Sequence, residues 1–146
     1  MIKLIANNAN ETIEIGKKIG KNLEAGDVVL LTGDLSAGKT TITKGIGAAL
    51  GVTKIINSPT FTIVKVYKGN KFPLYHLDLY RLDGLNEDFD LEEYIESDGV
   101  CVIEWPYQVS EILPKDYLLI TINSKSFEQR EIIIEGIGRY KDKEVV

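Results

Sequence analysis

An uninterrupted apolar run that leads into a glycine-containing loop constrains the fold more than any other feature of this sequence. Residues 28–32 (VVLLT) are apolar without alternation, which is typical of a strand that is covered on both faces of a sheet. Residues 39–50 then carry a helical pattern that Gly51 ends. Strand, loop and helix in this order predict an α/β fold in which residues 28–32 form a central strand.

The rest of the chain predicts further strands and helices around this central unit. The predicted strands are residues 2–5, 61–67, 71–78, 100–104, 117–123 and 128–135, of which 61–67 with 71–78 and 117–123 with 128–135 indicate hairpins. The predicted helices besides residues 39–50 are 10–23, with Asn8 or Asn10 as its N-cap, and 85–96. We therefore expect one α/β domain, residues 1–146, with a mixed sheet, parallel central strands, antiparallel hairpins and helices on the faces.

Length and charge restrict the partners that the chain can bind. Its 146 residues suit a single domain, and 17 basic residues against 22 acidic ones leave a net charge of -5. The basic residues are scattered among acids, so binding to nucleic acid by this chain alone is not expected. A local nest of backbone N–H groups can nevertheless hold phosphates on an acidic protein.

Neither a membrane segment nor a secretory signal is indicated by the sequence. The apolar runs stay well short of the ~18 residues that a membrane span needs, and the N-terminus lacks the apolar core and cleavage site of a signal peptide. The lone Cys101 lies in an apolar run, cannot form an internal disulfide and is expected to be an inert core residue. We therefore expect a cytoplasmic protein without membrane contact.

The loop after residues 28–32 matches the pattern Gly, any four residues, Gly-Lys-Ser/Thr at residues 33–40 (GDLSAGKT). Its glycines allow successive backbone N–H groups to point at phosphate oxygens, and the following helix adds its positive end. Lys39 can reach the terminal phosphates, and the Thr40 hydroxyl can bind Mg²⁺. Because the loop follows an apolar strand and opens a helix, it predicts a nucleotide-binding site. The residues predicted to line this site are Gly33, Ser36, Ala37, Gly38, Lys39, Thr40 and Thr41.

Two predicted strands end in an acidic residue that could hold the metal of such a site, directly or through water. These residues are Asp78, after residues 74–77 (LYHL), and Glu104, after residues 100–103 (VCVI). Side chains alternate along a strand, so His76 and Asp78 share one face. His76 with Asp78 can bind a metal or polarise water, or His76 can be an ordinary polar residue of an exposed edge strand.

A further segment, residues 57–62 (NSPTFT), lies between the predicted helix at residues 39–50 and the first hairpin. In nucleotide switches, a loop at this place is ordered by the terminal phosphate and its Mg²⁺. Thr60 or Ser58 could supply a hydroxyl group for such a contact, or Pro59 could form a turn that starts a strand. The residues alone leave both interpretations open.

Four motifs, residues 33–41 (GDLSAGKTT), 58–62 (SPTFT), 75–82 (YHLDLYRL) and 103–106 (IEWP), occur along the chain. In their order and spacing they resemble the TsaE family of bacterial P-loop ATPases, also called YjeE. The resemblance implies a P-loop NTPase-like domain that binds ATP and Mg²⁺ and hydrolyses ATP. It also implies a subunit of the complex that forms N6-threonylcarbamoyladenosine next to the anticodon of tRNA. TsaB and TsaD are the implied partners, and tRNA is contacted only indirectly through the complex.

The same resemblance implies roles for individual residues. The residues expected to be catalytic are Lys39, Asp78 and Glu104; those expected to hold Mg²⁺ are Thr40, Asp78 and Glu104; those expected to bind the nucleotide outside the loop are Thr12, Thr60 and Arg130. Thr12 would lie on the base side and Arg130 would approach from the last hairpin, although surface or capping roles fit both residues equally well.

Two other functions remain open at this point. A nucleotide-gated docking switch that does not hydrolyse ATP would use every residue named above, so only turnover distinguishes it. A small kinase or GTPase fits less well, because a guanine-reading Asn-Lys-X-Asp element and a lid that excludes water are missing. Arginine is sparse, so an activating group is expected from a partner. Trp105, the lone tryptophan, is expected either in the core or beside the site.

Overall fold

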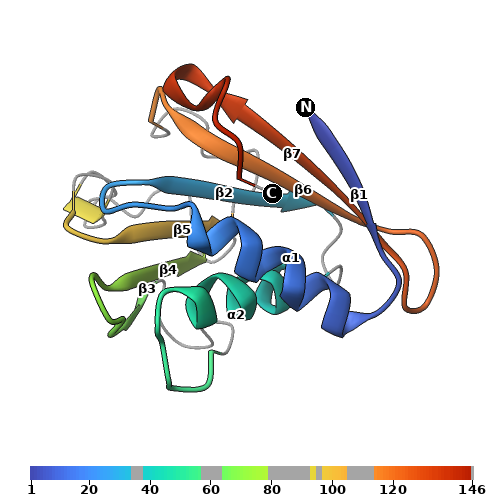
Figure 1. Cartoon of the computed structure of the whole chain (residues 1–146), viewed down its shortest axis with the longest axis horizontal. Coiled ribbons are helices and arrows are strands. Elements are labelled where there is room, and N and C mark those ends of the chain that lie inside the picture. Colours follow the sequence, from blue (N-terminus) through green and yellow to red (C-terminus); the bar gives the residue numbers. More distant parts are fainter. Residues whose placement is uncertain (34–37, 57–63, 79–92, 95–96, 105–113, 146) are drawn as a thin grey trace, which may run out of the picture.

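Strand β2 (Val28–Gly33) lies in the middle of the sheet in the computed structural model (Figure 1). The structure describes residues 1–33, 38–56, 64–78, 93–94, 97–104 and 114–145. The other strands are β1 (Ile2–Ala6), β3 (Val64–Tyr67), β4 (Leu74–Asp78), β5 (Val100–Glu104), β6 (Tyr117–Ser124) and β7 (Arg130–Ile137). The helices are α1 (Ala9–Lys21), α2 (Lys39–Ala49) and the short 3-10 helix η3 (Gly138–Tyr140).

Parallel pairing in the centre and antiparallel pairing on both sides confirm the predicted mixed sheet. Across the described residues the strand order is β1-β7-β6-β2-β5-β4-β3. Strand β2 pairs in parallel with β5 and β6, and β5 pairs in parallel with β4. The hairpins β3–β4 and β6–β7 and the pair β1–β7 are antiparallel. Residues 61–63, which were predicted to belong to the first hairpin, lie outside the described part.

Both long helices pack on the same face of the sheet (Figure 1). This face contains every second residue of the central strands, such as Val29 and Leu31, packed with Ile19 of α1 and Ile46 of α2. The alternate buried residues on the opposite face are Val28, Leu30, Leu77, Cys101 and Ile103. Of the predicted helix 85–96, only residues 93–94 are described, and they are helical. No helix in the described ranges is long and apolar enough to cross a membrane.

Helices α1 and α2 approach each other closely at glycines. Helix α1 begins at one of the two predicted caps, because Oδ1 of Asn8 accepts a hydrogen bond from the backbone N–H of Glu11 at 2.9 Å. A Cβ added to Gly16 would lie 3.0 Å from the Cα of Gly45, and one added to Gly45 would overlap the carbonyl oxygen of Ile13. The two backbones can therefore pack at this distance only because neither position carries a side chain.

Two hairpin strands begin later than the sequence pattern predicted. Strand β4 begins at Leu74 instead of residue 71, and Pro73 directly precedes it. Proline has no N–H for the strand ladder and is typical of a strand boundary. Strand β7 begins at Arg130 instead of residue 128, because the carbonyl oxygen of Gln129 still closes the turn by accepting from the N–H of Lys125 at 2.9 Å.

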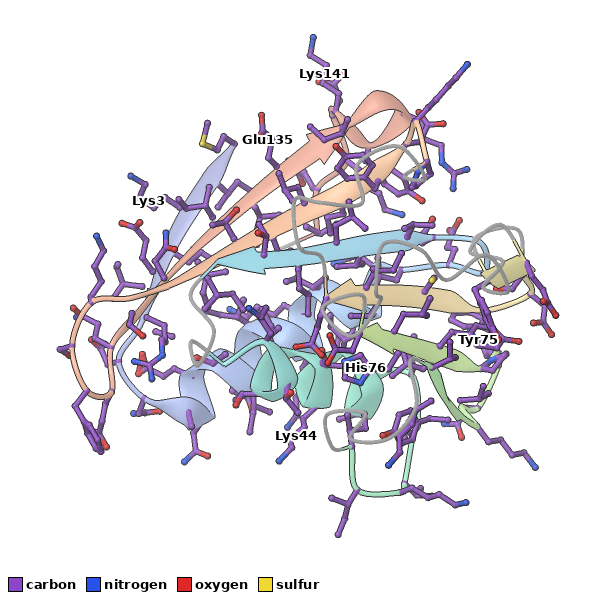
Figure 2. The ribbon with its side chains drawn as sticks, turned by 180° about the vertical axis from the view of Figure 1, so that it is seen from behind. Lys3, Lys44, Tyr75, His76, Glu135 and Lys141 are labelled. Carbon is purple, nitrogen blue, oxygen red and sulfur yellow. The ribbon has the colours of Figure 1, made fainter. Side chains whose placement is uncertain are left out.

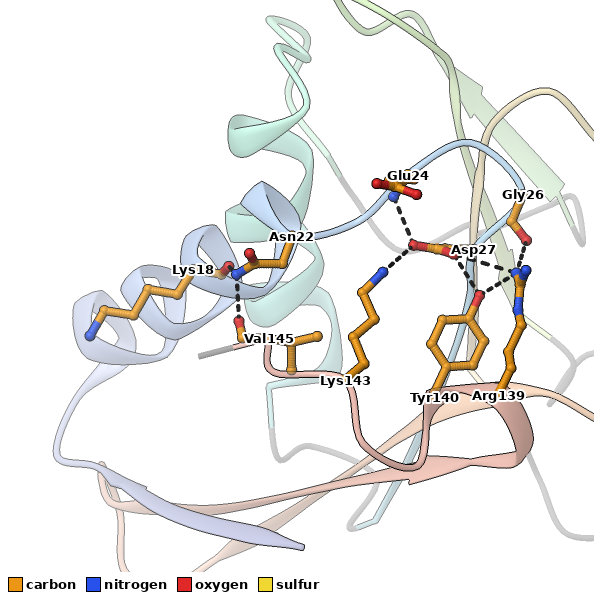
Figure 3. A network of polar contacts seen from close by, with 9 residues as sticks. All are labelled: Lys18, Asn22, Glu24, Gly26, Asp27, Arg139, Tyr140, Lys143 and Val145. Atoms are coloured by element: carbon orange, nitrogen blue, oxygen red, sulfur yellow. Dashed lines mark hydrogen bonds and ion pairs between the residues drawn. The ribbon is translucent and has the colours of Figure 1, made fainter.

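The C-terminal segment is fastened to the start of β2 by Asp27 (Figure 3). Its Oδ1 accepts a hydrogen bond from the Tyr140 hydroxyl at 2.6 Å, and its Oδ2 accepts one from the Lys143 ammonium at 3.1 Å. Burial, followed by this hydrogen bond to Asp27, raises the pKa of Tyr140 to about 12. At the end of α1, Asn22 donates to the carbonyl oxygen of Val145 at 3.1 Å. The last residues are thereby joined to both the sheet and a helix.

Candidate nucleotide-binding site

The carboxyl ends of β2, β5 and β4 meet at one edge of the sheet, where the chain leaves β2 for the loop before α2. The parallel register aligns Leu31 with Glu104, and Glu104 with Asp78. All three residues lie on the face that carries the helices, because side chains alternate and Val102 and Leu74 already belong to that face. The two predicted acids therefore lie side by side, on strands about 4.8 Å apart.

Asp78 and Glu104 are both buried, with 7% and 6% of their surface exposed. A buried carboxylate is unfavourable unless a cation or hydrogen-bond donors compensate its charge. Carboxylate oxygens are the donors that Mg²⁺ prefers, so this pair fits the metal that the motif implies. Among the described residues, no group of three or more His, Cys, Asp or Glu side chains could hold a metal alone. A Mg²⁺ ion here would need substrate phosphates and Thr40 as well, which is its usual mode of binding.

His76 lies on the same face as Asp78, and its ring contacts the other acid. The Nε2 atom is 3.1 Å from Oε2 of Glu104, and the side chain of His76 is fully buried. Figure 2 shows His76 in the interior, whereas Lys44 of α2 points outward. The interpretation of His76 as a residue of an exposed edge strand is therefore wrong, because β3 covers the outer side of β4.

Lys39 begins α2 directly after the loop, and only 4% of it is exposed. Its Nζ donates to the carbonyl oxygen of Gly33 at 3.5 Å. Gly38 has a φ of 101°, a conformation that favours glycine, and a side chain on Gly33 would overlap the carbonyl oxygen of Ile122. Both ends of the loop thus require glycine, and the first turn of α2 points its N–H groups toward the loop.

A pocket of about 200 Å³ brings together predicted residues that are far apart in the sequence. The residues that line it are Ala9, Thr12, Gly38, Thr41, Phe127, Glu128 and Arg130. Thr12 is buried, and its hydroxyl donates to the carbonyl oxygen of Asn8 at 3.4 Å. The Arg130 guanidinium donates to the carbonyl oxygens of Ser126 and Gln129, both at 3.0 Å. The first turn of α1, the N-terminus of α2 and the turn after β6 therefore form one candidate binding surface.

Several predicted residues lie outside the described part, and three residues that line the pocket, Ala9, Phe127 and Glu128, were not predicted. Ser36, Ala37, Thr60 and Trp105 lie outside the described residues. Thr40 is half-buried in the first turn of α2. Among the lining residues that were not predicted, Phe127 had a signal in the sequence, because it is a single aromatic residue in an otherwise polar turn. Phe127 is 95% exposed.

A larger hollow, of about 730 Å³, lies near the other end of α2, around the β3–β4 turn. Lys54, Lys68 and Lys71 line it together with uncharged residues. None of the predicted site residues in the described part contributes to this hollow. Within the described ranges, Asp78, Glu104 and Lys39 instead lie at or beside the carboxyl ends of the parallel strands, where ligands bind in open α/β sheets.

Comparison with known proteins shows which family the chain resembles over most of its length. The family model described as "Threonylcarbamoyl adenosine biosynthesis protein TsaE" matches residues 6–132. The tRNA threonylcarbamoyladenosine biosynthesis protein TsaE of Bacillus subtilis (strain 168) is 46% identical over 135 residues, covering 92% of this chain and 85% of the relative. The protein of the same name from Treponema pallidum (strain Nichols) is 40% identical, covering 91% and 99%. The crystal structure of Bacillus subtilis YdiB superposes with a TM-score of 0.84 at 39% identity, covering 97% of this chain and 88% of that one.

Proposed function

The chain belongs to the TsaE family of threonylcarbamoyl adenosine biosynthesis proteins, and from this premise we propose that it binds and hydrolyses ATP with Mg²⁺. It does so as a cytoplasmic subunit of the bacterial complex that forms N6-threonylcarbamoyladenosine next to the anticodon of tRNA. TsaB-like and TsaD-like proteins are its partners and carry out the transfer itself. The net charge of -5 suits a subunit that contacts tRNA only through its partners.

One observation supports ATP hydrolysis above all others. Two buried carboxylates, Asp78 and Glu104, lie side by side at the sheet edge from which the loop with Lys39 departs. Buried acids beside a buried ammonium group and a helix N-terminus form an arrangement that binds both a metal and phosphates.

In this proposal the residues of the chain position and neutralise the reacting groups. Lys39 and the N–H groups of the first turn of α2 bind the terminal phosphates. Thr40 and Glu104 hold Mg²⁺, and Asp78 orients the attacking water. The metal, when bound, neutralises charge on the phosphates. Thr12 and Arg130 bind the nucleoside side of the nucleotide. Little covalent chemistry is required of the protein, because phosphoryl transfer depends mostly on positioning and charge.

Phosphate release from ATP and from GTP tests the proposal. The purified chain is assayed alone and together with TsaB and TsaD. We expect release from ATP in preference to GTP, and a higher rate with the partners. Partner binding that depends on ATP without any release would indicate the docking switch instead. A preference for GTP would contradict the assignment of the nucleotide.

A further inference from the structure

His76 is a buried titratable residue that has no role in the proposed mechanism. It is the only histidine of the chain and is fully buried. It stands on β4 two residues before Asp78, on the same face. Burying a polar ring is unfavourable unless the ring has polar partners. The place of His76, next to the two acids of the site, therefore requires an explanation.

The contact with Glu104 determines which ring nitrogen carries the proton. A carboxylate only accepts hydrogen bonds, so Nε2 must be the donor in the 3.1 Å contact with Oε2. In a neutral imidazole, Nδ1 is then an acceptor. Within the described residues Nδ1 is buried and has no hydrogen-bond partner. The ring therefore makes one polar contact there, and that contact is directed at an acid of the site.

We propose that His76 is a positioning residue that holds the Glu104 carboxylate through Nε2–H. One carboxylate oxygen is thereby fixed, and the other stays available to the metal or to water. A glutamate side chain has several rotatable bonds, and a buried donor of fixed geometry selects one of its conformations. This inference rests on the proposed function, because it assumes that Glu104 holds Mg²⁺ when the nucleotide is bound.

The tautomer can be measured directly in the wild-type protein without any substrate. Because the chain has one histidine, a ¹⁵N-edited NMR spectrum of the ring contains a single imidazole. We expect Nε2 to carry the proton and Nδ1 to show the signal of an unprotonated ring nitrogen. A proton on Nδ1 with an unprotonated Nε2, or rapid exchange between both forms, would overturn the proposal.

A matched pair of variants then tests the effect on the metal. His76→Gln keeps an N–H donor at a similar distance from the backbone, whereas His76→Leu fills the space with an apolar side chain and removes the donor. The readout is the Mg²⁺ concentration that gives half of the maximal thermal stabilisation of the protein with ADP. We expect His76→Leu to raise this concentration by roughly 10- to 100-fold and His76→Gln to change it by less than about 3-fold.

Nucleotide binding without Mg²⁺ serves as the control, and both variants should retain it. An unchanged Mg²⁺ dependence in His76→Leu, or an equal loss in both variants, would contradict a positioning role. If His76→Leu does not fold, the measurement of the tautomer in the wild-type protein still tests whether Nε2–H of His76 donates to Glu104. Failure of the wild-type protein to bind ADP with or without Mg²⁺ would instead refute the proposed function, whatever the tautomer is.

Discussion

Burial determines the chemistry of single residues in this protein, and Cys101 is the simplest case. The thiol is completely buried in the sheet, as its apolar neighbours predicted. Burial raises the pKa of Cys101 to about 12, because the interior disfavours the charged thiolate. Reactivity of cysteine follows the thiolate, so this side chain is a packing residue and not a nucleophile.

The native thiol of Cys101 should therefore react slowly with thiol-specific reagents. At pH 8, the thiolate fraction alone predicts labelling of Cys101 on the order of 10³-fold slower in the native protein than in the urea-unfolded chain. A colorimetric disulfide reagent measures both rates. Rapid stoichiometric labelling of the native protein at pH 8 would show that Cys101 is accessible and would contradict the assigned burial.

The site residues differ in how far sequence could predict them. Asp78 and Glu104 end apolar strands and could be identified from position alone. Their pairing with each other, and the contact of His76 with Glu104, depend on the register between β4 and β5, which local patterns do not contain. Phe127 reaches the pocket only because the hairpin folds toward α1 and α2.

The contact between α1 and α2 positions the helix that begins with Lys39. The sequence predicted both helices from their periodicity and from signals such as Asn8 and Gly51. It did not predict how closely they pack, because the glycines at positions 16 and 45 meet only in three dimensions. A shift of α2 along this contact would displace the N–H groups of its first turn.

Substitution of Gly45 by alanine should destabilise the fold. Its Cβ would overlap the backbone of Ile13, which cannot move without separating the helices, so we expect a loss of about 1 to 3 kcal/mol in the free energy of unfolding. Gly47→Ala on the same helix is the matched control, because its Cβ would overlap only the end of the flexible Ile56 side chain and would meet Leu74 and Val52 at ordinary contact distances of 3.4 and 3.6 Å. Urea denaturation measures both variants. Equal stability of the two variants would contradict the close helix contact.

The network around Asp27 connects the start of β2 with the C-terminal segment, and it joins residues more than 100 positions apart in the chain. Residues 138–145 carry no periodic pattern, so the sequence predicted neither the short helix η3 nor its anchoring. Local patterns likewise do not predict the order of the strands in the sheet. The combination of parallel and antiparallel strands was predicted, because continuous apolar runs indicate central parallel strands and the hairpins indicate antiparallel pairs. The sequence thus predicts the helices, the strands and the fold class, but not the contacts between residues that are distant in the chain.

Tyr140→Phe should weaken the attachment of the C-terminal segment to Asp27. The variant loses the hydroxyl that donates to Asp27 at 2.6 Å, and we expect a loss of roughly 1.5 kcal/mol in unfolding free energy at pH 8. The raised pKa adds a pH dependence: wild-type stability from this group is complete below pH 10 and is lost as the pH rises toward about 12. The variant should lose less stability over that interval.

Tyr75→Phe provides the control, since it removes a hydroxyl that donates to Asp98 at 3.0 Å on the exposed surface. We expect a change below about 0.5 kcal/mol, because exposed hydrogen bonds exchange readily with water. Thermal unfolding from pH 8 to 12 compares the three proteins. A steeper alkaline loss for Tyr140→Phe than for the wild type would contradict the assigned role of this hydroxyl.

Single-turnover phosphate release by the wild type and by Lys39→Ala tests the proposed hydrolysis of ATP at the carboxyl edge of the sheet. Removal of the ammonium group should slow release about 10²-fold, which corresponds to roughly 3 kcal/mol of transition-state stabilisation. The assay includes TsaB and TsaD, and thermal unfolding verifies that the variant is folded. Release from Lys39→Ala at the wild-type rate, or no release from the wild type with its partners, would show that ATP is not hydrolysed at this site.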